Sequence, residues 1–227
     1  MRPPFHASPP RSLTELEDRV GWLACRDLSE VEAAFGSAGA GPMRKRKGKV
    51  GQLIERALGA SAGARSAPDF PGLGVELKTI PVTEQGRPRE STFIASFSLA
   101  DAETAEWESS PVRQKLAHVL WVPIVHEASQ MRIGRPRFWI PTPDQEAVLR
   151  ADFDDIVGMV AIGKGALLDA RLGRWLQARP KAAHGEVRTR AYGHEGQIES
   201  LVPRGFYLRA RFTGALLRDP QTMAGAD

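Results

Sequence analysis

The pattern of apolar and polar positions predicts two helices near the start of the chain. Ser12 and Glu15 have the spacing of a capping box and precede apolar positions that recur at helical spacing. We therefore expect a first helix that runs to about Leu28. The same serine-to-glutamate spacing recurs from Ser29 and predicts a second helix that reaches Phe35.

A third helix is expected after a glycine-rich and basic stretch. Residues 37–49 should form a flexible basic linker, because glycine and charged residues replace the apolar positions there. Apolar positions return at helical spacing over residues 50–58, and Gly59 supplies the residue type that commonly ends a helix. Glu55 lies on this third helix.

Alternating side chains over residues 75–80 predict a β-strand. Glu76 and Lys78 stand two positions apart, so their side chains should point to the same side of it. Pro81 should end this strand or mark it as a sheet edge. Further β-rich runs occur at residues 92–99, 119–125, 137–140, 174–178, 197–202 and 206–208.

Helices are also expected between these strands. Ser110–Pro111 and Thr142–Pro143 each combine an N-cap residue with a proline suited to the first helical turn, and the second helix should reach about Ile162. Residues 211–218 should form a short last helix. The alternation of helices and strands, without a glycine-rich dinucleotide or phosphate loop, predicts an α/β fold with a mixed sheet and flanking helices.

The composition favours a cytoplasmic protein with one domain, or two lobes of one domain. Hydrophobic residues make up 42% of the 227 residues and charged residues 26%, which is enough for a sizeable core. No run approaches the roughly 18 apolar residues of a membrane span, and residues 1–10 lack the apolar run of a signal peptide. The single cysteine, Cys25, is expected to be a small buried residue in the first helix.

Basic residues are in modest excess but unevenly placed. The 31 lysines and arginines exceed the 27 acidic residues, which gives a formal charge of +4. Basic residues crowd the stretch from Arg44 to Lys49 and the C-terminal third of the chain. This distribution makes a polyanionic partner plausible, although the first run alone is more simply a solvated loop.

Asp69 and Glu76 could together hold a divalent cation. Hydrolysis of a phosphodiester needs a cation that stabilises charge on the phosphate and a group that supports proton loss from the attacking water. Magnesium is usually held by one or two carboxylates with waters and phosphate oxygens, so two converging carboxylates suffice. The turn at Pro71 and Gly72 could fold the carboxylate of Asp69 back over the strand that carries Glu76.

Lys78, Leu77 and Glu55 add to this candidate site. Lys78 can orient the water or neutralise developing charge, and the Leu77 carbonyl is available as a further metal ligand. The pattern has the D-(x)n-E-x-K form of restriction-type nucleases, although acid-x-lysine triplets are common in so charged a chain. Glu55 on the preceding helix and the basic linker favour a cation and phosphate site.

Two other classes of hydrolase lack their motifs. The five histidines show no HExxH pair and no Cys/His spacing of a zinc site. Ser61 lies between alanines in a Gly-Ala-Ser-Ala-Gly segment, which differs from the GxSxG setting of serine hydrolases. Neither a zinc enzyme nor a serine hydrolase is therefore expected.

Several ordered blocks of the sequence resemble the MutH family of mismatch-repair endonucleases. The blocks are residues 48–55, 58–63, 69–70, 73–82, 86–88, 92–93, 112–113, 115–116, 119–121, 179–183 and 203–208. The likeness spans about residues 12–217. It implies a restriction-endonuclease-like fold with two arms around a DNA cleft. It also implies magnesium-dependent nicking of the unmethylated strand at hemimethylated GATC sites after activation by MutL, and we expect a monomer.

The resemblance also implies roles for individual residues. Asp69, Glu76 and Lys78 would be the catalytic set, with Glu55 assisting at the metal centre and Lys115 approaching the cleaved strand. Positions that match the DNA-binding surface are Lys47, Gly48, Phe93, Arg179, Pro180, Lys181, Arg204, Gly205 and Tyr207. The Pro/Gly/Ala-rich tail over residues 219–227 departs from the family and is expected to be disordered.

Two other functions stay open at this point. A GATC-specific restriction endonuclease of the same fold would cut both strands and ignore MutL. A DNA-binding protein of the same fold would have lost catalysis, although the acid and lysine residues of the motif are present.

Overall fold

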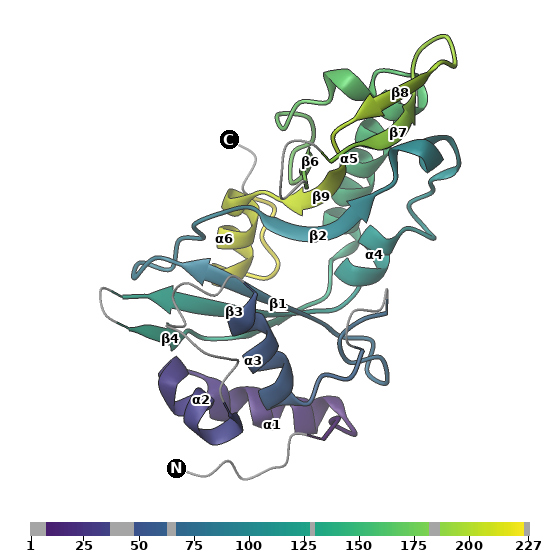
Figure 1. Cartoon of the computed structure of the whole chain (residues 1–227). Coiled ribbons are helices and arrows are strands. Elements are labelled where there is room, and N and C mark those ends of the chain that lie inside the picture. Colours follow the sequence, from purple (N-terminus) through teal and green to yellow (C-terminus); the bar gives the residue numbers. More distant parts are fainter. Residues whose placement is uncertain (1–7, 37–47, 63–66, 128–129, 182–186, 225–227) are drawn as a thin grey trace. The chain divides into compact units, whose positions relative to one another are not determined.

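The computed structural model describes residues 8–36, 48–62, 67–127, 130–181 and 187–224. The chain divides into two compact units. We call Met1–Arg89 with Ala117–Ile140 the first unit, and Glu90–Leu116 with Pro141–Asp227 the second unit. Both units contain helices and strands (Figure 1), which confirms the predicted α/β class.

The first unit begins with three helices: α1 (Leu13–Leu23), α2 (Leu28–Phe35) and α3 (Lys49–Leu58). α1 starts where the capping pattern predicts, because the Ser12 side chain accepts a hydrogen bond from the Glu15 backbone N–H at 3.1 Å. The Glu15 carboxylate in turn accepts from the backbone N–H of Arg11 at 2.8 Å. Free backbone donors at this helix start are therefore satisfied by side chains.

α1 ends at Leu23 and not near Leu28, so the predicted end is wrong. Cys25 adopts a φ of 63°, in the left-handed region, which a continuing helix cannot accommodate. Its backbone N–H donates to the carbonyl of Gly134 at 3.4 Å. Cys25 is exposed, so the expectation of a buried cysteine within a helix is also wrong.

The ends of α2 and α3 differ from the prediction in detail. Asp27, and not Ser29, is the N-cap residue of α2. Gly48 is the N-cap residue of α3 with a φ of 86°, so the end of the expected linker belongs to this helix start. The rest of that linker, residues 37–47, lies outside the described residues. Gly59 ends α3 in the left-handed conformation, as predicted.

The sheet of the first unit has four strands: β1 (Glu76–Val82), β3 (Val119–His126), β4 (Met131–Ile133) and β5 (Arg137–Trp139). β1 pairs in parallel with β3, while β4 and β5 pair with β3 in antiparallel fashion, so the sheet is mixed as predicted. β1 lies at the edge of this sheet, which explains how it tolerates Pro81. β4 was not predicted from the sequence.

Apolar side chains join the helices of the first unit to its sheet. Leu53, Ile54 and Leu58 on α3 are fully buried in one cluster with Leu77 on β1 and Leu120 on β3. Burial of one such side chain contributes roughly 1.5–3 kcal/mol. This packing therefore holds α3, and Glu55 with it, against β1.

The described part of the second unit has two antiparallel sheets, formed by β2 (Thr92–Phe97), β6 (Leu176–Pro180), β7 (Thr189–Tyr192), β8 (Ile198–Leu201) and β9 (Arg204–Leu208). β9 lies between β2 and β6, and β7 pairs with β8. β7 was not predicted from the sequence. β6 starts later than the predicted Arg174, because the Asp152 carboxylate takes the backbone N–H groups of Arg174 and Trp175, both at 2.6 Å.

The helices of the second unit are α4 (Pro111–Leu116), α5 (Pro143–Ala161) and α6 (Ala210–Arg218), with 3₁₀ helices η2 (Leu99–Thr104) and η3 (Gly165–Leu167). α4 and α5 begin as predicted. The Ser110 hydroxyl accepts from Arg113 N–H at 3.0 Å, and the Thr142 hydroxyl accepts from Gln145 N–H at 3.2 Å. α5 is the longest described helix, and none of the described helices is long and apolar enough to cross a membrane.

The C-terminal tail is attached to α5 over much of its length. The side-chain amide of Gln145 donates to the carbonyls of Pro220 and Thr222, both at 2.9 Å. Residues 219–224 therefore differ from the expected disordered tail, because a buried glutamine fixes their backbone. Residues 225–227 lie outside the described residues.

Candidate active site and nucleic-acid interface

The loop before β1 folds Asp69 back onto that strand. Phe70 and Val75 form an isolated antiparallel bridge, in which the Phe70 N–H donates to the Val75 carbonyl at 2.9 Å. The closed turn lets Asp69 Oδ2 accept the backbone N–H of Leu77 at 2.8 Å. The carboxylate thus lies against the strand that carries Glu76, in the position expected from the sequence.

Glu76 and Lys78 extend from the same side of β1. Glu76 is only 1% exposed, and its backbone N–H donates to the His118 carbonyl at 2.9 Å. Lys78 Nζ donates to Glu76 Oε1, and the two side chains form an ion pair. The buried carboxylate therefore lies beside an amine that is also largely shielded from water.

Glu55 approaches this pair from α3. α3 comes close to β1 at Gly51, where an added Cβ would lie 3.5 Å from Thr79 Oγ1 and 3.8 Å from Glu55 Oε1. Burial raises the pKa of Glu55, the charges of Asp69 and Glu76 raise it further, and Lys78 opposes them. We call Glu55, Asp69 and Glu76 the acidic cluster, because their carboxylates are near enough to repel one another.

The acidic cluster fits magnesium in its chemistry. Its oxygens are hard ligands, and a divalent cation would relieve the repulsion that raises the pKa of Glu55. Among the described residues, no three His, Cys, Asp or Glu side chains converge closely enough to hold a metal ion between them. Electrostatic repulsion acts over a longer range than ligation, so the two observations agree. A site with two carboxylates, from Asp69 and Glu76, would be of the kind that magnesium usually occupies together with water ligands.

In the second unit, the structure gathers four of the residues matched to the DNA-binding surface. Phe93 on β2 and Tyr207 on β9 are opposite in register, and their rings meet edge to face with centroids 5.3 Å apart. Lys181 follows β6 and places Nζ 4.4 Å from the centroid of the Phe93 ring. The same Nζ donates to Ser96 Oγ at 2.5 Å. We call Phe93, Arg179, Lys181 and Tyr207 the aromatic–basic cluster.

Arg179 joins the aromatic–basic cluster through a serine. Ser91 Oγ accepts from Arg179 Nη1 at 3.1 Å and from Gln177 Nε2 at 2.8 Å. Burial raises the pKa of Tyr207, the Arg179 charge lowers it, and Glu90 raises it. Tyr207 is therefore a neutral, half-buried ring near the charge of Arg179.

Three more matched residues lie at strand ends beside this cluster. They are Arg204 and Gly205 at the start of β9 and Pro180 at the end of β6. A Cβ on Gly205 would meet the Phe93 ring at 2.8 Å and the Ala95 carbonyl at 3.1 Å, so the ring packs where a side chain would be. Arg204 pairs in register with Pro180. Burial lowers the pKa of Arg204, but a guanidinium remains charged at neutral pH.

Three other matched residues lie elsewhere in the sequence. Lys47 lies outside the described residues, and Gly48 caps α3. Lys115 lies on α4 of the second unit, while the acidic cluster belongs to the first unit.

Three polar residues of the aromatic–basic cluster's surroundings were missed by the sequence analysis. They are Ser91, Ser96 and Gln177, which receive or donate the hydrogen bonds of the aromatic–basic cluster. Serine and glutamine near strand ends carry no signal of their own, because their partners are far away in the sequence. Only the pairing of β2, β9 and β6 could have indicated them.

Comparison with known proteins identifies the family. The family model described as "DNA mismatch repair enzyme MutH" matches residues 58–152. A protein named DNA mismatch repair protein MutH from Shewanella amazonensis is 44% identical over 214 residues, which cover 92% of this chain and 96% of that protein. A protein of the same name from Vibrio cholerae (strain O395) is 41% identical over 213 residues, with 92% and 96% covered. The chain therefore belongs to the MutH family of DNA mismatch repair enzymes.

Proposed function

We propose that this chain is a magnesium-dependent endonuclease that nicks the unmethylated strand at hemimethylated GATC sites once MutL has activated it. The observation that carries the proposal is the position of the Asp69 carboxylate. It accepts a hydrogen bond from the Leu77 N–H, on the strand that also carries Glu76 and Lys78. Two carboxylates and one amine at the start of a single strand are the groups that phosphodiester hydrolysis needs.

Asp69 and Glu76 would hold the cation in this mechanism. Bound magnesium supplies charge stabilisation at the phosphate and lowers the pKa of water. The hydrogen bond from Leu77 N–H keeps the Asp69 carboxylate on the strand side of the site, so little reorganisation is needed before the ion arrives. The Leu77 carbonyl supplies a neutral oxygen beside the two charged ones.

Lys78 and Glu55 would act on the attacking water and its surroundings. Lys78 Nζ already lies at the Glu76 carboxylate, so its positive charge would be held next to a phosphate bound at this site. It would hold a proton there or orient the water. Glu55 has a raised pKa and is half-buried, which suits a group that supports a proton near the metal.

The aromatic–basic cluster would recognise the DNA sequence. Lys181 has three N–H donors at Nζ, and the bond to Ser96 uses one of them. Two donors remain for the O6 and N7 acceptors of guanine in the major groove. The Tyr207 ring, supported by Phe93, would contact the adenine whose N6 methylation distinguishes the two strands.

The test is a set of GATC duplexes that are unmethylated, hemimethylated or fully methylated, with each strand labelled separately. With magnesium and MutL, we expect nicks in the unmethylated strand only and no product from the fully methylated duplex. Cleavage of the methylated strand would refute the strand choice.

A supercoiled plasmid with GATC sites separates the alternatives. A nicking enzyme converts it to open circles, whereas a restriction endonuclease gives linear DNA in one encounter. DNA binding without any cleavage in magnesium would indicate an inactive binding protein.

A further inference from the structure

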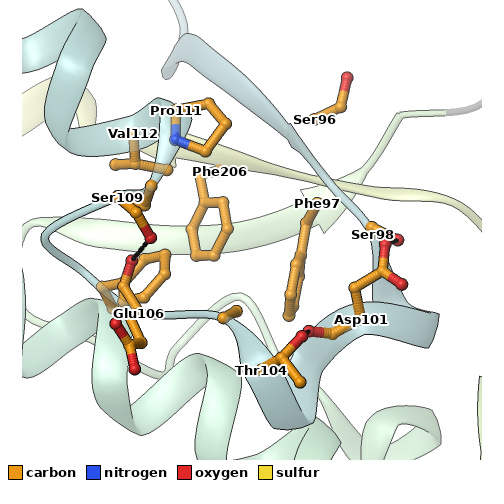
Figure 2. Close-up of a pocket in the computed structure, with 13 residues that line it drawn as sticks. Ser96, Phe97, Ser98, Asp101, Thr104, Glu106, Ser109, Pro111, Val112 and Phe206 are labelled. Carbon is orange, nitrogen blue, oxygen red and sulfur yellow. Dashed lines mark hydrogen bonds between the residues drawn. The ribbon is translucent and has the colours of Figure 1, made fainter.

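The two faces of the sheet formed by β2, β9 and β6 have different surroundings. The Phe97 and Phe206 rings lie on one face, where their centroids are 4.8 Å apart and they line a pocket of about 290 Å³. Ser96 points away from these rings (Figure 2), and its Oγ accepts a hydrogen bond from the Lys181 ammonium. The aromatic–basic cluster therefore lies on the face of the sheet opposite to the pocket.

The two cations of the aromatic–basic cluster are held by neutral hydroxyls. Ser91 Oγ accepts from Arg179 Nη1 at 3.1 Å, and Ser96 Oγ accepts from Lys181 Nζ. Among the described residues, neither cation forms an ion pair with a carboxylate. A hydroxyl has no net charge, so it orients a cation without neutralising it. Both positive charges therefore remain available to an anion.

A buried glutamine fixes the position of the Ser91 hydroxyl. Gln177 lies on β6 opposite Tyr207 and is only 4% exposed. Its Nε2 donates to Ser91 Oγ at 2.8 Å. Since a hydroxyl oxygen has two lone pairs, Gln177 and Arg179 together occupy the acceptor sites of Ser91. The exposed Arg179 side chain is thus attached to a buried part of the sheet.

Arg179 keeps most of its hydrogen-bonding capacity in this arrangement. A guanidinium has five N–H donors in one plane, and the bond to Ser91 uses one of them. Burial raises the pKa of Tyr207 and the Arg179 charge opposes that rise, so the guanidinium lies near the Tyr207 ring. An arginine side chain loses rotamer entropy when it binds a ligand, and one that is already held loses less.

We propose that Ser91 is a positioning residue for DNA recognition: it holds the Arg179 guanidinium near Tyr207 and leaves its charge and remaining donors for the DNA. The proposal rests on the DNA-binding role proposed above for the aromatic–basic cluster. Planar arginine donors bind phosphate oxygens, or O6 and N7 of guanine, in pairs, so their orientation matters. A carboxylate in place of the Ser91 hydroxyl would hold the guanidinium but would also neutralise it.

The position of Arg179 can be measured in the free protein. The order parameter of its Nε–H group, from ¹⁵N relaxation, should be about 0.8 in wild type and below about 0.6 in Ser91→Ala. Ser91→Thr keeps the hydroxyl and Ser91→Asp supplies another acceptor, so both should keep Arg179 ordered. A mobile guanidinium in wild type, or equal order in wild type and Ser91→Ala, would overturn the proposal.

DNA affinity without magnesium tests the purpose of this position. Ser91→Ala should bind a duplex about threefold to tenfold more weakly than wild type, and Ser91→Thr should bind like wild type. Ser91→Asp should bind more weakly than Ser91→Ala, although its Arg179 stays ordered. Ser109 supplies the control, because it lines the pocket on the opposite face, near Glu106 (Figure 2). Ser109→Ala should bind like wild type, and Ser109→Asp should lose less affinity than Ser91→Asp.

The effect of Ser91 on DNA affinity should depend on Arg179. In a chain with Arg179→Ala, the change Ser91→Ala should cause no further loss. A further loss would mean that Ser91 acts without Arg179, and it would overturn the proposal, as would equal losses from Ser91→Asp and Ser109→Asp. These affinities can be measured on any duplex. A wild type that binds DNA without preferring GATC would therefore contradict the proposed function and not the role of Ser91.

Discussion

Asp69→Asn separates the charge of the Asp69 carboxylate from its hydrogen bond. In the wild type, Asp69 Oδ2 accepts the Leu77 N–H at 2.8 Å. An asparagine carbonyl can accept the same bond without a negative charge, whereas Asp69→Ala removes both the acceptor and the charge. The pair of variants therefore distinguishes a structural role from a role in binding the cation.

The cost to stability follows from the geometry of this one bond. A hydrogen bond to a charged group contributes about 1.5–3 kcal/mol, and the lower end applies here because the bond is only part-buried. Asp69→Ala should therefore cost about 1.5 kcal/mol. Asp69→Asn keeps a neutral bond and should cost about 0.5 kcal/mol. In a protein of this size these costs correspond to decreases in Tm of roughly 3–6 °C and 1–2 °C.

Activity should respond differently from stability. Both variants lose a carboxylate that would hold the cation, so both should lose nicking of a hemimethylated GATC duplex by at least about a thousandfold. DNA binding, measured by gel shift without magnesium, should stay near wild type. The assays are nicking rates at saturating magnesium and thermal melts of the same preparations.

The outcome for Asp69→Asn decides between the two roles. Wild-type nicking by Asp69→Asn, together with loss by Asp69→Ala, would mean that only the hydrogen bond to Leu77 matters. Loss of nicking by Asp69→Asn at a temperature where it is fully folded supports cation binding.

Three further predictions concern the second unit. Ser96→Ala removes the acceptor that holds the Lys181 ammonium, so preference for GATC over near-cognate duplexes should fall about threefold to tenfold, while Ser96→Thr should restore it. Tyr207→Ser should bring the ratio of nicking rates on unmethylated and hemimethylated duplexes closer to one. An unchanged ratio would exclude Tyr207 from strand choice. Arg113 holds the pKa of Glu146 below its usual range, so this pair stabilises the fold at neutral pH and the gain disappears as the pH falls through that lowered pKa. Glu146→Gln should therefore melt slightly below wild type at pH 7, and the difference in Tm should shrink as the pH falls through the lowered pKa of Glu146.

The starts of α1, α4 and α5 could be predicted because their determinants are local. The Ser12, Ser110 and Thr142 caps each satisfy a backbone N–H three residues ahead, within a segment that the sequence displays directly. The end of α1 could not be predicted from the sequence. The left-handed turn at Cys25 is accompanied by a backbone hydrogen bond to Gly134, which is remote in the sequence. The predicted start of β6 was wrong because the backbone N–H groups of Arg174 and Trp175 donate to Asp152, which is also remote in the sequence.

The acidic cluster and the aromatic–basic cluster also differ in how far their contacts could be predicted from the sequence. Asp69, Glu76 and Lys78 lie within one turn and one strand, so side-chain alternation and the Pro-Gly turn were enough to predict that Asp69 folds back onto the strand where Glu76 and Lys78 pair. The contacts of Ser91 and Ser96 instead depend on how β2, β9 and β6 pair, and no local pattern encodes this register. The bulge between Phe93 and Ala95 shifts this register further.

The most direct test of the central claim is the magnesium dependence of nicking by wild type and Glu76→Gln on one hemimethylated GATC duplex. Glu76→Gln keeps the volume of a side chain that is 1% exposed and removes the charge that would hold the cation. The account predicts saturable nicking of the unmethylated strand by wild type and no nicking by Glu76→Gln at any magnesium concentration. Nicking by wild type in a chelator, or wild-type rates from folded Glu76→Gln, would contradict it.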